Sequence, residues 1–208
     1  MFGLNEKLSL PALLLVLWGA VIGVGLLWMT DYSLSPGSHE EPLVERPSDT
    51  PVPFSEEKST LVIFLHPRCP CTHPSVAAIE RLMVRKHDMV LQPIFYLPGS
   101  KPETWARADY WDRVVDAGAH EPLIDVDGGV ARQFHATTSG HAILFSVDGE
   151  VLYSGGITSG RVHEGDNLGL TTLTRVLEQV PVQDATFPVY GCSIVKKQDN
   201  DAGAGHVH

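Results

Sequence analysis

Cysteine and positive charge are both scarce in this sequence. Only three of the 208 residues are cysteines, Cys69, Cys71 and Cys192. That is too few for a disulfide scaffold, and the odd number leaves at least one thiol free, metal-bound or available for exchange. Lys and Arg number 15 against 25 Asp and Glu, a net charge of −10, which argues against nucleic acid or anionic lipid headgroups as partners. The length suits one domain plus appendages.

Several catalytic motifs are also missing. The sequence has no Walker-type loop, no G-x-G-x-x-G after a strand and no H-E-x-x-H, which argues against the nucleotide and zinc-protease sites that those motifs build. Cys71-Thr72-His73 is not the C-x-x-C-H motif of covalent haem attachment.

One long apolar run lies near the N-terminus. Leu8 to Met29 is almost wholly apolar, with no charge between Lys7 and Asp31. About twenty helical residues cover the roughly 30 Å hydrocarbon core of a bilayer. A secretory signal peptide would have a shorter apolar region and a small-residue cleavage site, which Leu26–Met29 does not offer. We predict an uncleaved single-pass anchor at residues 9–29, with cleavage as the alternative.

The charges around this run predict its orientation. The α-amino group and Lys7 precede it, and the residues that follow are mostly acidic, with Arg46 the only nearby Lys or Arg. The positive-inside rule then places the N-terminus in the cytoplasm and the bulk of the protein on the extracytoplasmic, periplasmic side of the cytoplasmic (inner) membrane. Gly19 and Gly23 form a GxxxG pair, which predicts either a homodimer through the anchor or, more simply, a lipid-facing helix.

The chain divides into four parts by composition. Residues 1–30 are the cytoplasmic stub and transmembrane anchor, and residues 31–58 are a Pro-, Ser- and Glu-rich linker, expected to be extended and poorly ordered. Residues 59–195 form the globular domain, and residues 196–208 are a polar tail expected to be disordered.

The domain reads as α/β, with helices on both faces of a central mixed sheet. We expect strands at 61–65, 90–96 and 122–126, and a hairpin of 142–147 with 151–153 around Asp148-Gly149. Helices are expected at 74–86, at 130–134 and at 168–180, the last capped by Asp166 or Asn167. A further helix is expected to open at a Ser100/Glu103 capping box and to end at Gly118.

The stretch from Thr60 to Met83 organises the domain. An apolar strand ends at His66-Pro67, the Cys69-Pro70-Cys71 triplet follows, and a helical period begins after it. A helix N-terminus carries free N–H groups and a partial positive charge, which favour thiolate over thiol. Pro70 suits the first helical position, but Pro74 disfavours helix at the residue before it. The cysteines are therefore expected in the turn just before the helix.

These motifs resemble the thioredoxin-like superfamily, within it the membrane-anchored TlpA- and ResA-like group, and most of all RedB-type proteins. FLHPRCPCTHPSVAAIERL occupies the place of the group's W-C-x-x-C segment, and PLIDVDGGVARQFHATTSGHAILFSVDGEVLYSGG resembles its D-x-x-G to F-L-I-D-x-x-G block. The Cys-Pro-Cys pair, the GGIT…HEGDN run and the terminal PVYGC are similar to RedB-type sequences. The resemblance implies a thioredoxin-like fold and exchange of thiols with a partner protein.

Two departures from the group's pattern alter the expected site. The pair is Cys-x-Cys and not Cys-x-x-Cys, so any disulfide within it would close a small ring with strain and easy reduction. His141, preceded by Gly140, stands where the group has a cis-proline facing the thiols. The proline's roles in substrate pairing and in keeping metals off the thiols are therefore in doubt, and a histidine there is a candidate metal ligand or proton carrier.

Further site residues follow from the expected topology. From Val180 to Cys192 is 12 residues, which span up to about 40 Å when extended, enough to return Cys192 from the last helix to the Cys-Pro-Cys turn. There it would be a resolving thiol or third metal ligand, or else a lone tail cysteine. The long polar loop Gly155–Asn167 should emerge at the same edge, where Arg161, His163 and Glu164 are candidates for thiolate stabilisation and acid–base chemistry, or simple loop residues.

We therefore predict a tethered thiol–disulfide oxidoreductase, without a cofactor, in which Cys69 attacks, Cys71 resolves and Cys192 is a possible third partner. Its partners would be extracytoplasmic protein thiols or disulfides. The main alternative is binding and delivery of copper or zinc, with Cys69, Cys71, His141 and Cys192 as ligands. In that reading, His66, His73 and His163 are further neighbours, and the tail His206 and His208 would bind metal weakly at best. The remaining alternative is a non-catalytic binding module of the same fold.

Overall fold

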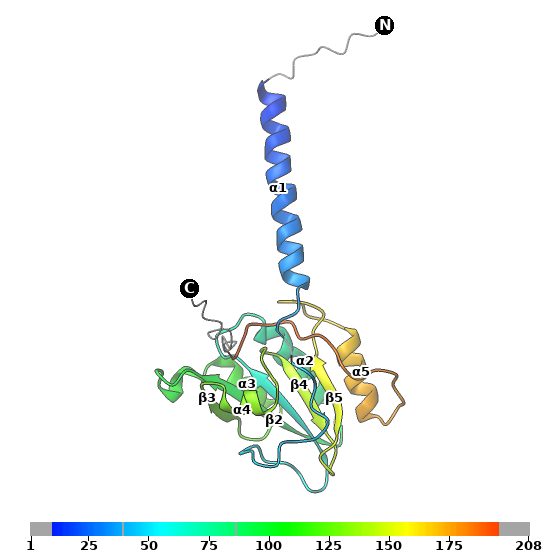
Figure 1. Cartoon of the computed structure of the whole chain (residues 1–208). Helices are drawn as coiled ribbons and strands as arrows, with labels where there is room; N and C mark the ends of the chain where they lie inside the picture. Colours follow the sequence, from blue (N-terminus) through cyan, green and yellow to red (C-terminus); the bar gives the residue numbers. More distant parts are fainter. Residues whose placement is uncertain (1–9, 39, 86, 196–208) are drawn as a thin grey trace, which may run out of the picture. The chain divides into compact units, whose positions relative to one another are not determined.

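The computed structural model describes residues 10–38, 40–85 and 87–195 and forms two units, 1–35 and 36–208. The first unit contains a single helix, α1 (Leu10–Leu34) (Figure 1). Its 25 residues have a mean hydropathy of 2.4 in the most apolar window, and none of them is buried. By length and composition this helix is able to cross a membrane, although a signal sequence meets the same criterion. The expected stub before Leu10 and the expected tail after Val195 lie outside the described residues.

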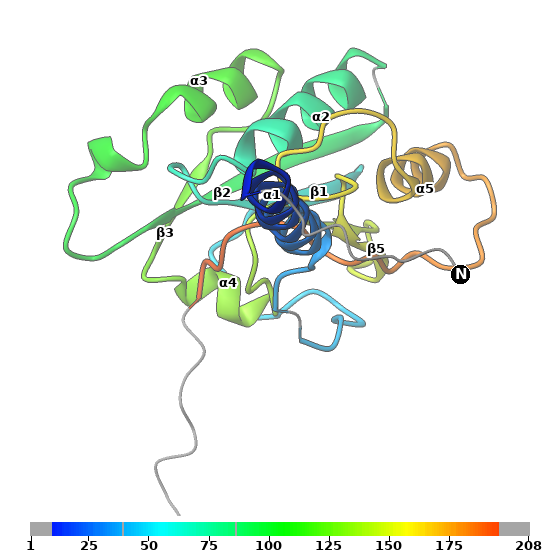
Figure 2. The same ribbon diagram turned by 90° about the horizontal axis from the view of Figure 1, so that it is seen from above.

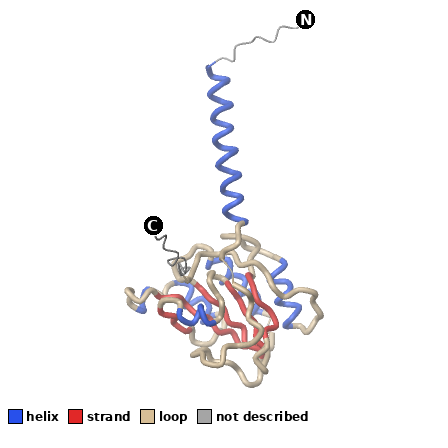
Figure 3. The backbone as a smooth tube through the Cα atoms, viewed as in Figure 1, coloured by secondary structure: helices blue, strands red, loops and turns tan. Residues whose placement is uncertain are grey.

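A five-stranded mixed sheet forms the centre of the second unit (Figure 3). Its strands are β1 (Ser59–Leu65), β2 (Met89–Leu97), β3 (Leu123–Val126), β4 (His141–Phe145) and β5 (Val151–Gly156), in the spatial order β3-β2-β1-β4-β5. β1 pairs in parallel with β2, and β2 in parallel with β3, whereas β4 runs antiparallel to both β1 and β5. The central strand β1 therefore has neighbours of both senses.

Helices cover both faces of this sheet, as the sequence predicted. α2 (Thr72–Val84), α3 (Asp109–Asp116) and α5 (Leu168–Leu177) lie on one face, and α4 (Gly129–Gln133) lies on the other (Figure 2). Leu61, Ile63 and Leu65 of β1 join the core under the three helices, while Val62 and Phe64 join the core under α4. β1 is thus buried on both faces, which explains its continuous apolar run.

One expected helix is wrong. The Ser100/Glu103 capping box does not form. In its place Glu103–Trp105 is a short 3-10 turn whose N-cap, Pro102, is extended, and the α-helix starts only at Asp109. Pro102 disfavours the α conformation at Lys101, the residue that would follow a Ser100 N-cap, which works against a helix that starts at Ser100. The helix does end before Gly118, which has a φ of 97° as a C-terminal glycine often does.

The expected linker also differs from the structure. The segment 40–58 packs against the domain, where Val44, Glu45 and Arg46 bond to the backbone of the β4–β5 hairpin, and Val52 is 4% exposed. The Phe54 ring lies edge-on to Phe145 with 5.3 Å between centroids. The Pro, Ser and Glu content of the segment suggested disorder, although it also contains Val52 and Phe54. Burial of these two apolar side chains stabilises the ordered segment.

Candidate functional site

The turn after β1 holds two of the three cysteines. The Cys69 amide donates to the His66 carbonyl (3.1 Å), and the Thr72 amide donates to the Cys69 carbonyl (2.9 Å), which winds the chain tightly after the strand. α2 begins at Thr72 with Cys71 as its N-cap residue. The expected strand, turn and helix are all present, and both cysteines precede the helix, but Pro70 does not occupy its first position.

The third cysteine reaches the same place from the C-terminal segment. The Ser139 amide donates to the Cys192 carbonyl (2.8 Å), and the Ile194 amide donates to the Thr137 carbonyl (2.9 Å). Residues 192–194 therefore pair in an antiparallel manner with the loop before β4, as the bridge between Thr138 and Ser193 also shows. Because β4 starts beside the end of β1, this pairing brings Cys192 to the Cys-Pro-Cys turn.

The disulfide joins Cys69 to Cys192, and Cys71 is a free, buried thiol. The sequence favoured a bond within the Cys69/Cys71 pair, so the structure corrects that expectation for the oxidised form. The Cα atoms of Cys69 and Cys192 are 6.2 Å apart, inside the usual range for a disulfide, whereas a Cys-x-Cys ring requires an unusual turn. The three sulfur atoms lie within 4.8 Å of one another, so the bond and the free thiol share one site.

The three cysteines differ in exposure. Cys69 is 2% exposed and Cys71 is 5% exposed, whereas Cys192 is partly exposed. The two cysteines that the sequence placed at the centre of the chemistry are therefore buried, and Cys192 is the more accessible residue.

Ser139 connects the three segments of the site and was not predicted. Its hydroxyl accepts from the His66 amide (2.9 Å) and contacts the Thr72 hydroxyl (3.1 Å), while its own amide holds Cys192. Ser139 is 1% exposed, so these bonds have little competition from water. The sequence did contain a signal for Ser139: it directly precedes Gly140-His141, where the sequence departs from the cis-proline of the thioredoxin-like group.

Replacement of Ser139 by alanine should loosen this connection. The variant leaves the part-buried His66 amide without its acceptor, a loss of about 1 kcal/mol of stability. Urea denaturation checks this value against Ser159→Ala, which alters an exposed serine of the Gly155–Asn167 loop. A Ser139→Ala variant as stable as Ser159→Ala would contradict the connecting role.

Gly191 allows the segment that carries Cys192 to approach the loop before β4. A Cβ at this position would overlap the Ser139 carbonyl oxygen, so only glycine permits the contact directly before Cys192. The sequence offered a signal in the Gly191-Cys192 pair at the end of PVYGC, but nothing in it indicated the neighbour that this glycine meets.

The residues beside the Cys-Pro-Cys turn are less positive than expected. The His66 ring stacks on Tyr96 (5.5 Å between centroids), and burial lowers the pKa of His66, which favours the neutral imidazole. The guanidinium of the exposed Arg68 lies 5.9 Å from the centre of the Trp105 ring.

The loop Gly155–Asn167 emerges at the cysteine edge of the sheet, as predicted from topology. Glu164 accepts from His73 in the first turn of α2 (2.7 Å), and the Arg161 guanidinium donates to the Gly191 carbonyl beside Cys192. The His163 ring bonds to the Arg161 carbonyl (2.8 Å). Asn167 caps α5 by accepting from the Leu170 amide (2.9 Å). Arg161 and Glu164 thus contact segments that carry the cysteines, and their chemical roles stay predictions.

His141 lies at the start of β4, opposite Phe64 at the end of β1. It is 9% exposed, its Nε2 bonds to the Ser154 hydroxyl (2.9 Å), and Gly140 before it has a φ of 92°. Burial lowers the pKa of His141 to about 4. With Ser154 it lines a cavity of about 530 Å³ formed mainly by segments 36–42 and 186–189.

The buried His141 predicts a pH dependence of stability. Because its folded pKa of about 4 is below the ordinary 6.5, only the unfolded chain binds a proton between these values, and stability falls as pH drops through this window. The loss approaches about 3 kcal/mol at pH 4. Urea denaturation at pH 7.5 and 4.5 measures it, and a His141→Gln variant should show a smaller loss. An equal loss in the variant and the parent would contradict this assignment.

The three cysteines form the single cluster of candidate metal ligands found among the described residues. His141, predicted as a fourth ligand, is not part of that cluster. Three thiolates are soft ligands suited to Cu(I) or Zn²⁺, but only in the reduced form, since two of these sulfurs are bonded in the structure.

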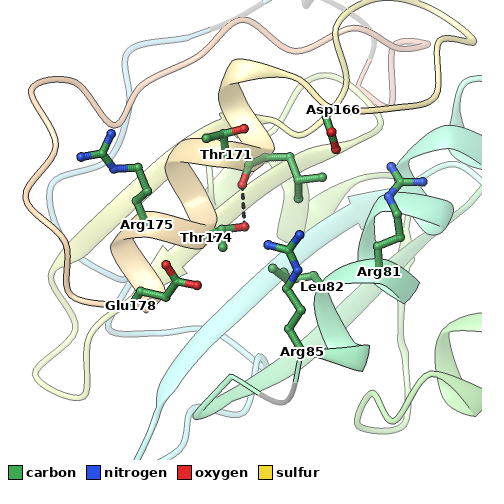
Figure 4. A pocket seen from close by; sticks show the side chains of 9 residues that line it. Arg81, Leu82, Arg85, Asp166, Thr171, Thr174, Arg175 and Glu178 are labelled. Carbon is green, nitrogen blue, oxygen red and sulfur yellow. Dashed lines mark hydrogen bonds between the residues drawn. The ribbon is translucent and has the colours of Figure 1, made fainter.

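A second cavity, of about 360 Å³, lies between α2 and α5 (Figure 4). Side chains of both helices line it, among them Arg81 of α2 and Arg175 of α5, together with Arg85 directly after α2. None of the predicted site residues lines it, so the candidate site is the cysteine cluster and not this cavity.

Comparison with known proteins places the fold. No family model matches the chain, and no curated protein matches it. An uncharacterized conserved protein from Geobacillus kaustophilus has a TM-score of 0.54 and 20% identity over 79% of this chain and 94% of its own. A hypothetical protein from Sinorhizobium meliloti has a TM-score of 0.52 and 16% identity over 80% and 97% of the two chains. Both likenesses concern the fold alone.

The strand order β3-β2-β1-β4-β5, with β4 antiparallel and a cysteine turn between the central strand and α2, decides the fold class. The fold is thioredoxin-like. A putative thioredoxin from Neisseria meningitidis also matches, with a TM-score of 0.42 and 20% identity over 59% of this chain and 75% of its own. The described peptide bonds of this thioredoxin-like domain include no cis bond, so the loop before β4 differs from the cis-proline loop that the resemblance implied.

Proposed function

We propose that this protein is a thiol–disulfide oxidoreductase that exchanges electrons with thiols or disulfides of a partner protein. The supporting observation is a disulfide with a free thiol beside it, all three sulfurs lying within 4.8 Å. Disulfide exchange proceeds by attack of a thiolate on a disulfide sulfur. The Cys69–Cys192 disulfide therefore supplies the bond that such an exchange opens and closes.

The proposed location is the extracytoplasmic face of the cytoplasmic membrane, with α1 as the tether. The length and apolar character of Leu10–Leu34 support the anchor, and the charges flanking it support the orientation. Disulfides persist in such an oxidising compartment. Within the thioredoxin-like proteins we assign the chain to the TlpA- and ResA-like group and its RedB type on the sequence motifs alone.

Reduction of insulin by the full chain in detergent, with dithiothreitol as the electron source, tests this function. We expect catalysed precipitation of the insulin chains that Cys69→Ser abolishes, because Cys69 belongs to the disulfide and its loss leaves no native pair. Ser159→Ala is the control, since it changes an exposed loop serine. The function is rejected when the parent protein is no faster than dithiothreitol alone, or when Cys69→Ser is as active as the parent.

Soft-metal binding is the second candidate, and the cysteine cluster is the observation that favours it. In the reduced protein, Cys69, Cys71 and Cys192 would supply three thiolates to one Cu(I) or Zn²⁺ ion. Titration of the reduced chain with Cu(I) against a competing chelator should then show one ion bound, with the affinity lost in Cys192→Ser. No uptake by the reduced parent protein would remove this candidate, and failure of both assays would leave a non-catalytic module.

A further inference from the structure

The partly exposed cysteine, Cys192, is in the C-terminal segment and not in the Cys-Pro-Cys turn. We propose that Cys192 is the residue through which the partner protein exchanges, and that Cys69 acts behind it. This inference rests on the proposed function and reverses the order that the sequence suggested, in which Cys69 attacks first.

Burial is the first argument. Cys69 is 2% exposed and Cys71 is 5% exposed, while Cys192 alone of the three is partly exposed. A thiolate attacks a disulfide sulfur directly, so access decides which sulfur reacts. Of the three cysteines, Cys192 is therefore the one that we expect a partner thiolate to reach first.

The second argument is that the segment carrying Cys192 is held on both sides. Ahead of it, the Arg161 guanidinium donates to the Gly191 carbonyl, and Val189 is 5% exposed and accepts from the Gly37 amide (2.8 Å). After it, Ile194 and Val195 are buried in the core under α4. These anchors do not depend on the disulfide, so Cys192 should stay beside Cys69 when the bond is opened.

The backbone around Cys192 leaves little freedom as well. The Cys192 carbonyl accepts from the Ser139 amide (2.8 Å), and the Gly191 backbone lies against the Ser139 carbonyl. A nucleophile held this way has its geometry arranged before the partner arrives, which lowers the entropic cost of the exchange step.

The electrons balance in either direction. When the protein reduces a partner, Cys192 thiolate attacks the partner disulfide, forms a mixed disulfide and releases one partner thiolate. Cys69 thiolate then attacks Cys192 Sγ, the second partner thiolate leaves, and the Cys69–Cys192 disulfide of the structure is formed. When the protein oxidises a partner dithiol, the same two steps run backwards. Each cycle transfers two electrons, and two protons follow them.

Labelling kinetics of the intact chain test the proposal without a variant. The reduced protein in detergent is exposed to a limiting amount of N-ethylmaleimide, quenched, and its peptides are measured by mass spectrometry. We expect Cys192 to be labelled about tenfold or more faster than Cys69 and Cys71, because access controls thiol reactivity when the other thiols are covered. Equal or faster labelling of Cys69 would overturn the proposal.

Trapping with a disulfide probe gives the second readout. With 5,5′-dithiobis(2-nitrobenzoic acid), Cys69→Ser should hold the mixed disulfide on Cys192, whereas Cys192→Ser should react about tenfold or more slowly. Ser193→Ala is the matched control, because it alters an exposed serine next to Cys192 and should leave the initial rate unchanged. A Cys192→Ser variant that reacts as fast as the parent would refute the role of Cys192. Insulin reduction by that variant at the parent rate would refute it too, while leaving the proposed function intact.

Discussion

Reduction of the Cys69–Cys192 disulfide is expected to lower the free energy of unfolding by about 3–5 kcal/mol. The bond joins residues 123 positions apart, so it restrains most of the unfolded domain, and the entropic benefit of a disulfide grows with the size of its loop. A loss of this size is a large fraction of the 5–15 kcal/mol that stabilises an ordinary domain.

Urea denaturation of the full chain in detergent, followed by tryptophan fluorescence with and without a phosphine reductant, measures this loss. The Cys71→Ser variant is the control, since it keeps the disulfide and should show the same difference. The Cys69→Ser variant should be insensitive to reductant and as unstable as the reduced parent. A parent protein whose denaturation midpoint does not move on reduction would contradict the assigned disulfide.

Replacement of Gly191 by alanine is expected to prevent formation of the native disulfide. The added Cβ would overlap the carbonyl oxygen of Ser139, and the two nearest atoms belong to the Ser139 backbone, which cannot move aside as a flexible side chain does. Overpacking of this kind typically costs about 1–3 kcal/mol. The overlap is relieved most easily when the segment around Gly191 moves away from Thr137–Ser139. This movement also carries Cys192 away from Cys69.

Peptide mapping under non-reducing conditions gives the readout. The parent protein should yield the Cys69–Cys192 linkage, whereas Gly191→Ala should yield mostly free Cys192. Ser193→Ala is the control, because Ser193 is exposed and its hydroxyl donates to the carbonyl of Val195, two residues further along the chain. Retention of the native linkage at parent levels in Gly191→Ala would show that the close approach to Ser139 does not position Cys192.

Local sequence patterns predicted most of the domain. The apolar run before His66 and the helical period after Pro74 are contained in adjacent residues, so strand β1, the cysteine turn and α2 were predictable. The Asp148-Gly149 turn likewise predicted the β4–β5 hairpin. The capping box failed because Ser100 and Glu103 matched a spacing, while Pro102 between them prevented the helix.

The contacts between distant segments were not predictable in the same way. The composition of residues 31–58 predicted a tether. It could not show that Val52 and Phe54 pack against the core under α4, because composition carries no information on contacts between distant segments. Three cysteines allow three pairings, and the adjacent pair was the natural choice. Cys192 pairs with Cys69 because its carbonyl accepts from the Ser139 amide and because Gly191 leaves room for this approach. Neither contact between distant segments produces a recognisable sequence motif.

The central claim is that Cys69 and Cys192 form the redox-active couple, with Cys71 as a thiol beside it. Its most direct test is a redox titration of the full chain in detergent, equilibrated in thiol–disulfide buffers, acid-quenched, unfolded and alkylated for peptide mass spectrometry. The account predicts that Cys69 and Cys192 lose their alkylation together as a two-electron couple while Cys71 stays alkylatable at every potential. Titration of Cys69 together with Cys71, with Cys192 a free thiol throughout, would contradict it.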